Sequence, residues 1–304
     1  MRFLRLKNIF LGGTLCLLLV SCKTSNSSAH IENWESLFNG QNLDGWTIKI
    51  ANRPLNENYL NTFQVEDQML RIVYDQYEDF DDKYGHLYYK QPYSHYKLRF
   101  DYRFVGAQTP GGEDWNVRNS GVMFHSQSAA SNAFEQHFPV SVEIQLLGGL
   151  GEGNRTTANI CTPGTAVVLQ DSVDYSHCIS SQSKTYHGDQ WVRVEAVVLG
   201  SDYVAHIVEQ DTVLEYKSPQ VGGAFISKNQ NGADWERMGV TNKEYWIAKE
   251  GALLSEGYIA LQAESHPIDF KNIELLNLCG CTDPKALNYK SYYVKNDPAS
   301  CQYK

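Results

Sequence analysis

The stretch YKLRFDYRFV, Tyr96–Val105, alternates strictly between apolar and charged residues. Charged side chains occupy one face of the extended chain, and the other face is apolar. The apolar face carries Tyr96, Leu98, Phe100, Tyr102 and Phe104. A period of two residues is typical of an antiparallel strand with one buried and one solvated face. This segment therefore predicts a long strand that covers a hydrophobic core.

Other segments repeat the pattern. Trp191–Val198 places Val192, Val194, Ala196 and Val198 on one side, and Tyr203–Val208 follows after the turn Gly200-Ser201-Asp202. These two segments predict a hairpin. Gly and Asn clusters punctuate the rest, and amphipathic helical signal is weak. We therefore predict an all-β fold, a sandwich or jelly roll with long loops.

The N-terminal residues have the pattern of an export signal. Arg2, Arg5 and Lys7 precede an apolar run, Ile9–Val20, that is too short for a comfortable membrane span of about 20 residues. The run ends in Leu19-Val20-Ser21-Cys22, which resembles a bacterial lipobox. We predict a lipoprotein signal peptide over 1–21, lipidation of Cys22 and a polar tether over 22–33. The alternative is an ordinary signal peptide with an incidental cysteine.

The charge balance limits the class of partner. The full chain carries a formal net charge of −9, and loss of the three cations in residues 1–21 would leave −12. An acidic surface disfavours nucleic acid and anionic membrane surfaces. We expect an exported protein, held at a bacterial membrane only by its lipid, that acts on neutral substrates.

The cysteines predict disulfides, because exported proteins fold in oxidising compartments. Cys161 and Cys178 bracket one loop and are predicted to pair. Three cysteines remain in the tail, residues 278–304, which resembles a small cysteine module of exported Bacteroidetes-type proteins. We favour a bond between Cys281 and Cys301, which leaves Cys279 free or paired elsewhere.

Three predicted strands have unusually polar outer faces. Ser141–Leu146 presents Glu143 and Gln145, Tyr258–Glu264 presents Gln262 and Glu264, and Gly121–His125 presents His125 just after Asn119. Side by side, these strands would form one wall of carboxylates, amides and an imidazole, which suits sugar hydroxyls. The alternative is an ordinary solvated face of an antiparallel sheet.

Long loops carry the remaining candidates. Trp115, Arg155, Trp235 and Trp246 lie on predicted connections, where aromatic rings could be stacking platforms or buried staples. His266 could transfer protons near neutral pH, although a lone histidine is more often structural. No HExxH or glycine-rich nucleotide motif occurs. Glu143 and Glu264 are far apart in the sequence, so their spatial separation is open.

Short motifs follow one another in order from about Trp34 to Asn277. They are Leu37–Trp46 (LFNGQNLDGW), Phe63–Leu70 (FQVEDQML), Tyr96–Arg103 (YKLRFDYR), Asn119–Val122 (NSGV), Val142–Gln145 (VEIQ), Gly257–Gln262 (GYIALQ), Glu264–Pro267 (ESHP) and Phe270–Ile273 (FKNI). This ordered set resembles the 3-keto-disaccharide hydrolase family. One segment departs from the common family pattern: Thr157–Gly164 replaces a Gly-x-Ile-Tyr motif, which puts substrate preference in doubt.

The resemblance implies a concanavalin/laminin-G-like jelly roll over 34–277 that cleaves 3-keto-glycosides. A ketone at C3 acidifies the proton at C2, so a base can remove it and the C1 substituent can leave by elimination, followed by addition of water. Glu143 and His266 are the acid/base candidates, with His125 next. The sugar would be held by Asn119, Gln145, Gln262, Glu264 and, from its loop, Arg155.

Some members of the family use a divalent metal, and no ligands for one can be assigned from this sequence. Other functions stay open at this point. They are a non-catalytic carbohydrate-binding lipoprotein, an adhesion module and an ordinary glycosidase with two carboxylates about 5–9.5 Å apart.

Overall fold

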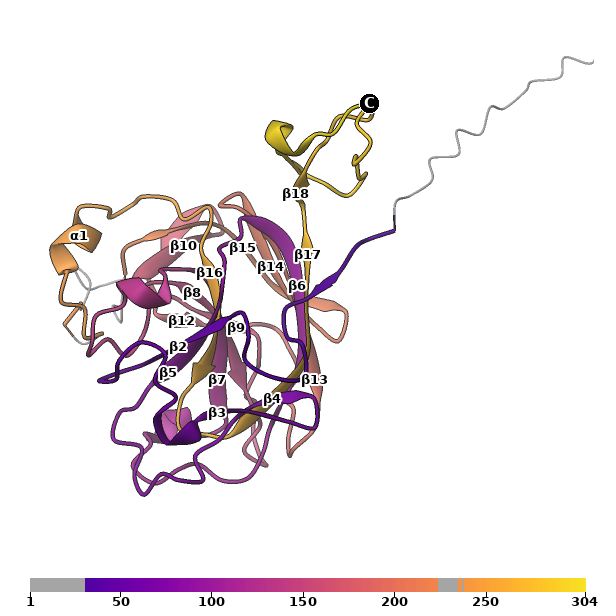
Figure 1. Ribbon diagram of the computed structural model, residues 1–304. Helices are drawn as coiled ribbons and strands as arrows, with labels where there is room; N and C mark the ends of the chain where they lie inside the picture. Colours follow the sequence, from indigo (N-terminus) through magenta and orange to yellow (C-terminus); the bar gives the residue numbers. More distant parts are fainter. Residues whose placement is uncertain (1–30, 224–234, 237) are drawn as a thin grey trace, which may run out of the picture.

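The computed structural model describes residues 31–304 except 224–234 and 237 (Figure 1). The predicted signal peptide, Cys22 and most of the predicted tether lie outside the described residues. The described chain is a β-sandwich built from two large antiparallel sheets. The prediction of an all-β, concanavalin-like sandwich is confirmed.

Ten strands form the first sheet, called sheet A. It contains, in spatial order, β11 (Ser172–Asp174), β10 (Thr165–Leu169), β15 (Asp211–Val221), β14 (Tyr203–Val208), β13 (Val192–Leu199), β6 (His95–Phe104), β17 (Ile268–Asn277), β4 (Met69–Ile72) and β3 (Phe63–Glu66), and β1 (Glu35–Ser36) also pairs with β17.

Seven strands form the second sheet, called sheet B. Its order is β12 (Cys178–Ile179), β9 (Asn159–Cys161), β8 (Val142–Leu147), β7 (Asn119–Ser126), β16 (Tyr258–Ala263), β5 (Gly85–Tyr89) and β2 (Trp46–Ile50). Apolar side chains from the inner faces of both sheets form one buried cluster between them. Because each strand alternates its side chains, the polar residues of both sheets face outward.

Strand β6 explains why the sequence adopts this fold. Its side chains alternate between buried and partly exposed along the whole strand, as predicted. Phe100 packs against Phe270 of β17 in the core, with ring centroids 6.0 Å apart. On the outer face, Arg103 pairs with Asp269. The predicted hairpin of β13 and β14 is also confirmed, and β13 pairs with β6.

Helical structure is minor. The described residues contain α1 (Lys243–Ile247) and the 3₁₀ turns η1 (Tyr59–Asn61), η2 (Asp114–Asn116), η3 (Ala129–Ser131) and η4 (Pro298–Ser300). In the part of the chain that the structure describes, no helix has the length and apolar character needed to cross a membrane.

The C-terminal residues form a small lobe that projects beyond the end of β17 (Figure 1, yellow). Its strands β18 (Cys279–Gly280) and β19 (Lys295–Asn296) pair in parallel. Cys281 and Cys301 form a disulfide, as do Cys161 and Cys178, so both predicted pairs are confirmed. Cys279 is free and lies with its Sγ 3.4 Å from the hydroxyl of Ser94.

Candidate functional site

The three strands with polar outer faces lie side by side in sheet B, in the order β8-β7-β16. Gln145 of β8 stands opposite Gly121 of β7, and Gln262 of β16 stands opposite His86 of β5. Asn159 of β9 extends the same row, because it pairs with Gln145. A row of polar side chains, interrupted at Gly121 of β7, therefore crosses the outer face of sheet B.

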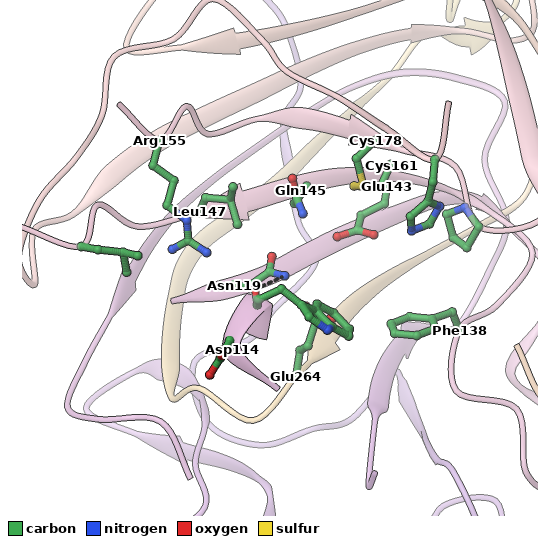
Figure 2. A pocket seen from close by; sticks show the side chains of 14 residues that line it. Asp114, Asn119, Phe138, Glu143, Gln145, Leu147, Arg155, Cys161, Cys178 and Glu264 are labelled. Atoms are coloured by element: carbon green, nitrogen blue, oxygen red, sulfur yellow. Dashed lines mark hydrogen bonds between the residues drawn. A yellow bond between two sulfur atoms is a disulfide. The ribbon is translucent and has the colours of Figure 1, made fainter. Parts of the chain in front are cut away.

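A cleft of about 580 Å³ lies over this row. That volume is in the usual range for a small-molecule site and can hold a disaccharide-sized ligand. Figure 2 shows the side chains of Asn119, Glu143, Gln145 and Arg155 directed toward one space, which Glu264 reaches from beyond the end of β16. The other residues that line the cleft are Asp114, Trp115, Phe138, Leu147, Leu150, Cys161, Pro163, His177 and Cys178.

Glu143 takes its place in the cleft because Gly121 has no side chain. A Cβ at residue 121 would lie 2.7 Å from both Cγ and Cδ of Glu143. The carboxyl therefore lies over the backbone of β7 instead of standing out from β8. A glycine in mid-strand is otherwise unfavourable and often marks a close approach of another group.

Two buried carboxyl groups meet in the cleft. Glu143 is 5% exposed and Glu264 is 3% exposed. Burial raises the pKa of Glu143 to about 8. Burial also raises the pKa of Glu264 well above its usual value, and the nearby charge of Glu143 raises it further, against the opposing effect of Arg155. Because like charges repel, ionisation of one carboxyl group disfavours ionisation of the other.

Arg155 is fixed beside this pair by backbone carbonyl groups. Its Nη1 donates hydrogen bonds to the carbonyl oxygens of Gly148 at 2.7 Å and of Arg118 at 3.2 Å. Burial lowers the pKa of Arg155, and its charge interacts favourably with Glu264. The cleft therefore offers a preorganised cation for an oxygen that develops negative charge.

Several polar atoms in and beside the cleft are buried without a hydrogen-bond partner among the described residues. They are Oδ1 of Asn119, Oε1 of Gln262 and Oε2 of Glu264. Buried polar groups in native proteins are nearly always paired with protein or water. Such unpaired atoms at a cleft wall are suited to accept hydrogen bonds from the hydroxyl groups of a ligand.

The other predicted amide, Gln145, is already partly satisfied. Its Oε1 accepts a hydrogen bond of 3.0 Å from the side chain of Asn159. Asn119 also donates one bond, of 3.2 Å, to the carbonyl oxygen of Trp115. Of the predicted sugar-binding residues, Asn119, Gln145, Glu264 and Arg155 line the cleft, and Gln262 lies in the adjoining row.

His125 lies outside the lining of the cleft, so its position does not support the predicted catalytic role. Its φ of 47° interrupts the alternation of β7, beside an irregularity in the pairing of β7 with β16. Its Nε2 lies 3.0 Å from the carbonyl oxygen of Gly200, in the β13–β14 turn of sheet A. Burial lowers the pKa of His125 to about 4. We therefore read it as a neutral structural histidine at the end of the sandwich.

His266 also falls outside the cleft lining, so its predicted direct acid/base role is not supported by its position. Its ring packs edge-on against Phe104, with centroids 5.6 Å apart. Burial lowers its pKa to about 4, and the charges of Arg118 and Arg155 act in the same direction. It is a neutral neighbour of the cleft arginine, and neither ring nitrogen has a partner among the described residues.

Sequence reasoning missed His86, which lies beside Gln262 in the polar row. It is buried, and burial lowers its pKa to about 3, so the ring is neutral. Its Nε2 has no partner in the described part of the chain. The alternation of His86 and Tyr88 around the core residue Leu87 was a signal that could have placed it on this face.

The loop tryptophans divide between the two predicted roles. Trp115 is 49% exposed and lines the cleft, as a stacking platform would. Trp235 and Trp246 are buried and stack on each other at 6.4 Å, as staples would. The disulfide of Cys161 and Cys178 also lines the cleft and joins β9 to β12.

We tested whether the chain offers a metal site. Within residues 31–223, 235–236 and 238–304, no cluster of three or more His, Cys, Asp or Glu side chains has the spacing of metal ligands. Among these residues, the pair formed by Glu143 and Glu264 therefore lacks the further protein ligands that a divalent cation usually takes.

Comparison with solved structures gives distant similarities. A putative glycosyl hydrolase from Parabacteroides distasonis is 16% identical, with a TM-score of 0.47, covering 81% of this chain and 99% of its own. The carbohydrate binding module CBM66 from Bacillus subtilis is 10% identical, with a TM-score of 0.42, covering 77% of this chain and 96% of its own. No curated protein matches the sequence.

Comparison with protein families gives a match that spans the whole sandwich. The model of the 3-keto-alpha-glucoside-1,2-lyase-like domain matches residues 33–276, which include both sheets and every residue of the cleft. The predicted resemblance is confirmed, with nearly the same boundaries. The chain belongs to the family of 3-keto-alpha-glucoside-1,2-lyase-like domains.

Proposed function

We propose that this protein cleaves 3-keto-glycosides in the cleft of sheet B, with Glu143 and Glu264 as its acid/base pair. The observation that carries the proposal is the meeting of two buried, mutually repelling carboxyl groups at one cleft. Elimination needs a base and an acid at one site, and two carboxyl groups, one ionised and one protonated, would supply both. Membership of the family supports the same substrate class.

The chemistry follows from the ketone at C3. The ionised carboxylate removes the proton from C2, and the electrons of the C2–H bond form an enolate whose oxygen is at C3. The enolate then expels the oxygen at C1, and an unsaturated ketone remains. The departing oxygen takes a proton from the protonated carboxyl group. Addition of water across that double bond, with OH to C1 and H to C2, completes hydrolysis.

The other residues of the cleft support these steps. The guanidinium of Arg155 is fixed beside Glu264 and would stabilise the enolate oxygen. The unpaired Oδ1 of Asn119 would accept a bond from a sugar hydroxyl. Glu264 thus moves from the predicted role of hydroxyl binder to a member of the catalytic pair.

The test is release of a chromophoric aglycone from a 3-keto-β-glucoside and from the unoxidised glucoside. We expect the wild type to cleave only the keto substrate, because only that compound has an acidic C2 proton. Glu143→Gln should lower kcat by about 100-fold or more, the usual contribution of a positioned acid or base. Glu250→Gln, at an exposed position, is the matched control and should leave the rate unchanged.

Two results would contradict the proposal. Equal cleavage of both glucosides would indicate an ordinary glycosidase, because that reaction does not need the ketone. Binding of the keto substrate without cleavage, in the presence and absence of added divalent metal, would indicate a carbohydrate-binding protein.

We also propose that the protein is exported and anchored by a lipid on Cys22. Two disulfides in the described chain support an oxidising compartment. Metabolic labelling with a radioactive fatty acid should mark the wild type and not Cys22→Ser. Equal labelling of both would contradict the anchor.

A further inference from the structure

The walls of the cleft differ in chemistry. The wall formed by β7, β8 and the end of β16 is polar except for Leu147 at the end of β8, whereas much of the remaining lining is apolar: Trp115, Phe138, Leu150, Pro163 and the Cys161–Cys178 disulfide. Trp115 and Leu150 are 49% and 58% exposed, so they present apolar surface to solvent. Exposed apolar groups at the mouth of a polar site need an explanation, because they favour binding of an apolar partner.

Trp115 is held in place before any ligand arrives. Its ring lies parallel to that of Tyr84, with an interplanar angle of 6° and a centroid distance of 6.2 Å. Tyr84 is itself fixed, because its hydroxyl accepts a 3.1 Å hydrogen bond from Asn116 and its ring packs edge-on against Phe80 at 4.9 Å. Tyr84 also packs against Phe138 of the cleft, at 4.9 Å. One face of the indole is thus supported, so little side-chain entropy remains to be lost when a ring stacks on it.

The distribution of hydrogen-bonding atoms separates two kinds of leaving group. The unpaired buried oxygens of Asn119, Gln262 and Glu264 belong to the polar wall, where the 3-keto ring would lie. A second sugar at the mouth would bring several hydroxyl groups to a surface of indole, leucine and disulfide, with exposed Asp114 and partly buried His177 as the other polar members. A flat apolar group could pack on that surface without leaving hydroxyl groups unpaired.

We infer that the mouth of the cleft is an aglycone subsite in which Trp115 binds an aromatic ring, so that the preferred substrates are 3-keto-glycosides of aromatic alcohols rather than disaccharides. This inference rests on the proposed function, because it assigns the leaving group of the same reaction. Leu150 contributes a second apolar contact to the subsite.

The experiment compares three 3-keto-β-glucosides whose leaving groups are benzyl alcohol, methanol and glucose. Benzyl alcohol and methanol leave as alkoxides of similar basicity, so the difference between their glucosides reports mainly binding of the aromatic ring. We expect KM for the benzyl compound to be about tenfold lower than for the other two, the size of one aromatic contact. Trp115→Ala should remove that advantage, whereas Trp115→Phe should keep most of it.

A matched pair of leucine variants tests the location. Leu150→Ala should raise KM for the benzyl compound severalfold, whereas Leu253→Ala, at a similarly exposed position away from the cleft, should not change it. Equal KM values for the three substrates, or a benzyl preference that survives in Trp115→Ala, would overturn the inference.

Failure of the proposed function can be told apart from failure of this inference. If the wild type cleaves none of the three compounds, calorimetric titration with benzyl and methyl β-glucosides still tests the subsite. Tighter binding of the benzyl compound that is lost in Trp115→Ala would support the subsite without the reaction. Equal affinity for the two compounds would overturn it.

Discussion

The outer faces of both sheets carry polar residues in the same alternating pattern, but the carboxyl groups on the two faces have different surroundings. On sheet A, the fully buried carboxylate of Asp269 accepts hydrogen bonds from Arg71 and Arg103, each at 2.9 Å, and Glu274 pairs with Arg99 at 2.7 Å. On sheet B, burial raises the pKa values of Glu143 and Glu264. The difference shows that oppositely charged groups pair across sheet A, whereas burial in the cleft of sheet B favours the protonated form of the carboxyl groups.

The largest effect is expected from removal of both cleft carboxyl groups. Glu143→Gln and Glu264→Gln should each lower kcat by about 10²–10⁴-fold, and the double variant should lose little more than either single variant. The reason is that the pair acts as one unit. Steady-state kinetics on a 3-keto-glycoside measure this, with Glu274→Gln on sheet A as the control that should retain activity. Multiplicative losses would show two independent roles instead.

The next largest effect concerns stability and sheet A. Asp269→Asn should lower the free energy of unfolding by about 2–3 kcal/mol, because it weakens two charge-assisted hydrogen bonds of a buried group. Urea denaturation checks this, and catalytic activity below the transition should be unchanged. Glu274→Gln, in a partly exposed pair, should cost less than about 1 kcal/mol. A loss of activity without a loss of stability in Asp269→Asn would contradict the assignment of stability to the outer face of sheet A and of activity to that of sheet B.

The pH dependence of the free energy of unfolding should also distinguish the cleft of sheet B from the outer face of sheet A. Burial raises the pKa of Glu143 to about 8 from 4.5, so between these values the folded state binds more protons than the unfolded state. Stability should therefore fall as pH rises from about 5 to about 8, by roughly 2 kcal/mol after allowance for relaxation of the site. Glu143→Gln should reduce this pH dependence of the free energy of unfolding, which urea denaturation at about pH 5 and about pH 8 measures. A stability that rises over the same interval would refute the buried protonated state.

The smallest effect tests the fit of Glu143 over β7. Gly121→Ala would place a methyl group 2.7 Å from Cδ of Glu143, so the carboxyl must move while the flexible side chain absorbs the contact. We expect about a tenfold loss in kcat and a change in unfolding free energy below about 1 kcal/mol. Adding Gly121→Ala to Glu143→Gln should cause no further loss of activity. A further loss would show that Gly121 acts through another group.

The sandwich could be predicted from the sequence because its signal is local. In β6 every second residue is apolar, and one strand of this length suffices to define a buried and a solvated face. The pairing of Cys161 with Cys178 was also legible, since the two bracket one loop. The adjacency of β8, β7 and β16 is a long-range property, so the sequence analysis could state it only as a condition for the polar wall.

The detailed site could not be predicted for physical reasons. Glu143 and Glu264 meet only through the order of strands in sheet B, which no local pattern encodes. His125 was misplaced because a single residue with positive φ reverses the face on which a side chain lies. Trp115 and Trp235 lie on similar aromatic loops, and only the packed structure shows that one is exposed and the other buried.

The first strand and the C-terminal lobe both lie next to the end of β17, which has a practical consequence. β1 pairs with Glu274 and Leu275 near the end of β17, and β18 of the C-terminal lobe begins two residues after β17 ends. Figure 1 shows the first strand and the lobe emerging on one side of the molecule. The cleft belongs to the other sheet. A reporter, a bead or a display scaffold fused to the C-terminal lobe would therefore be attached beside sheet A, whereas the cleft lies on sheet B, so the protein can be immobilised by this lobe with the cleft left accessible.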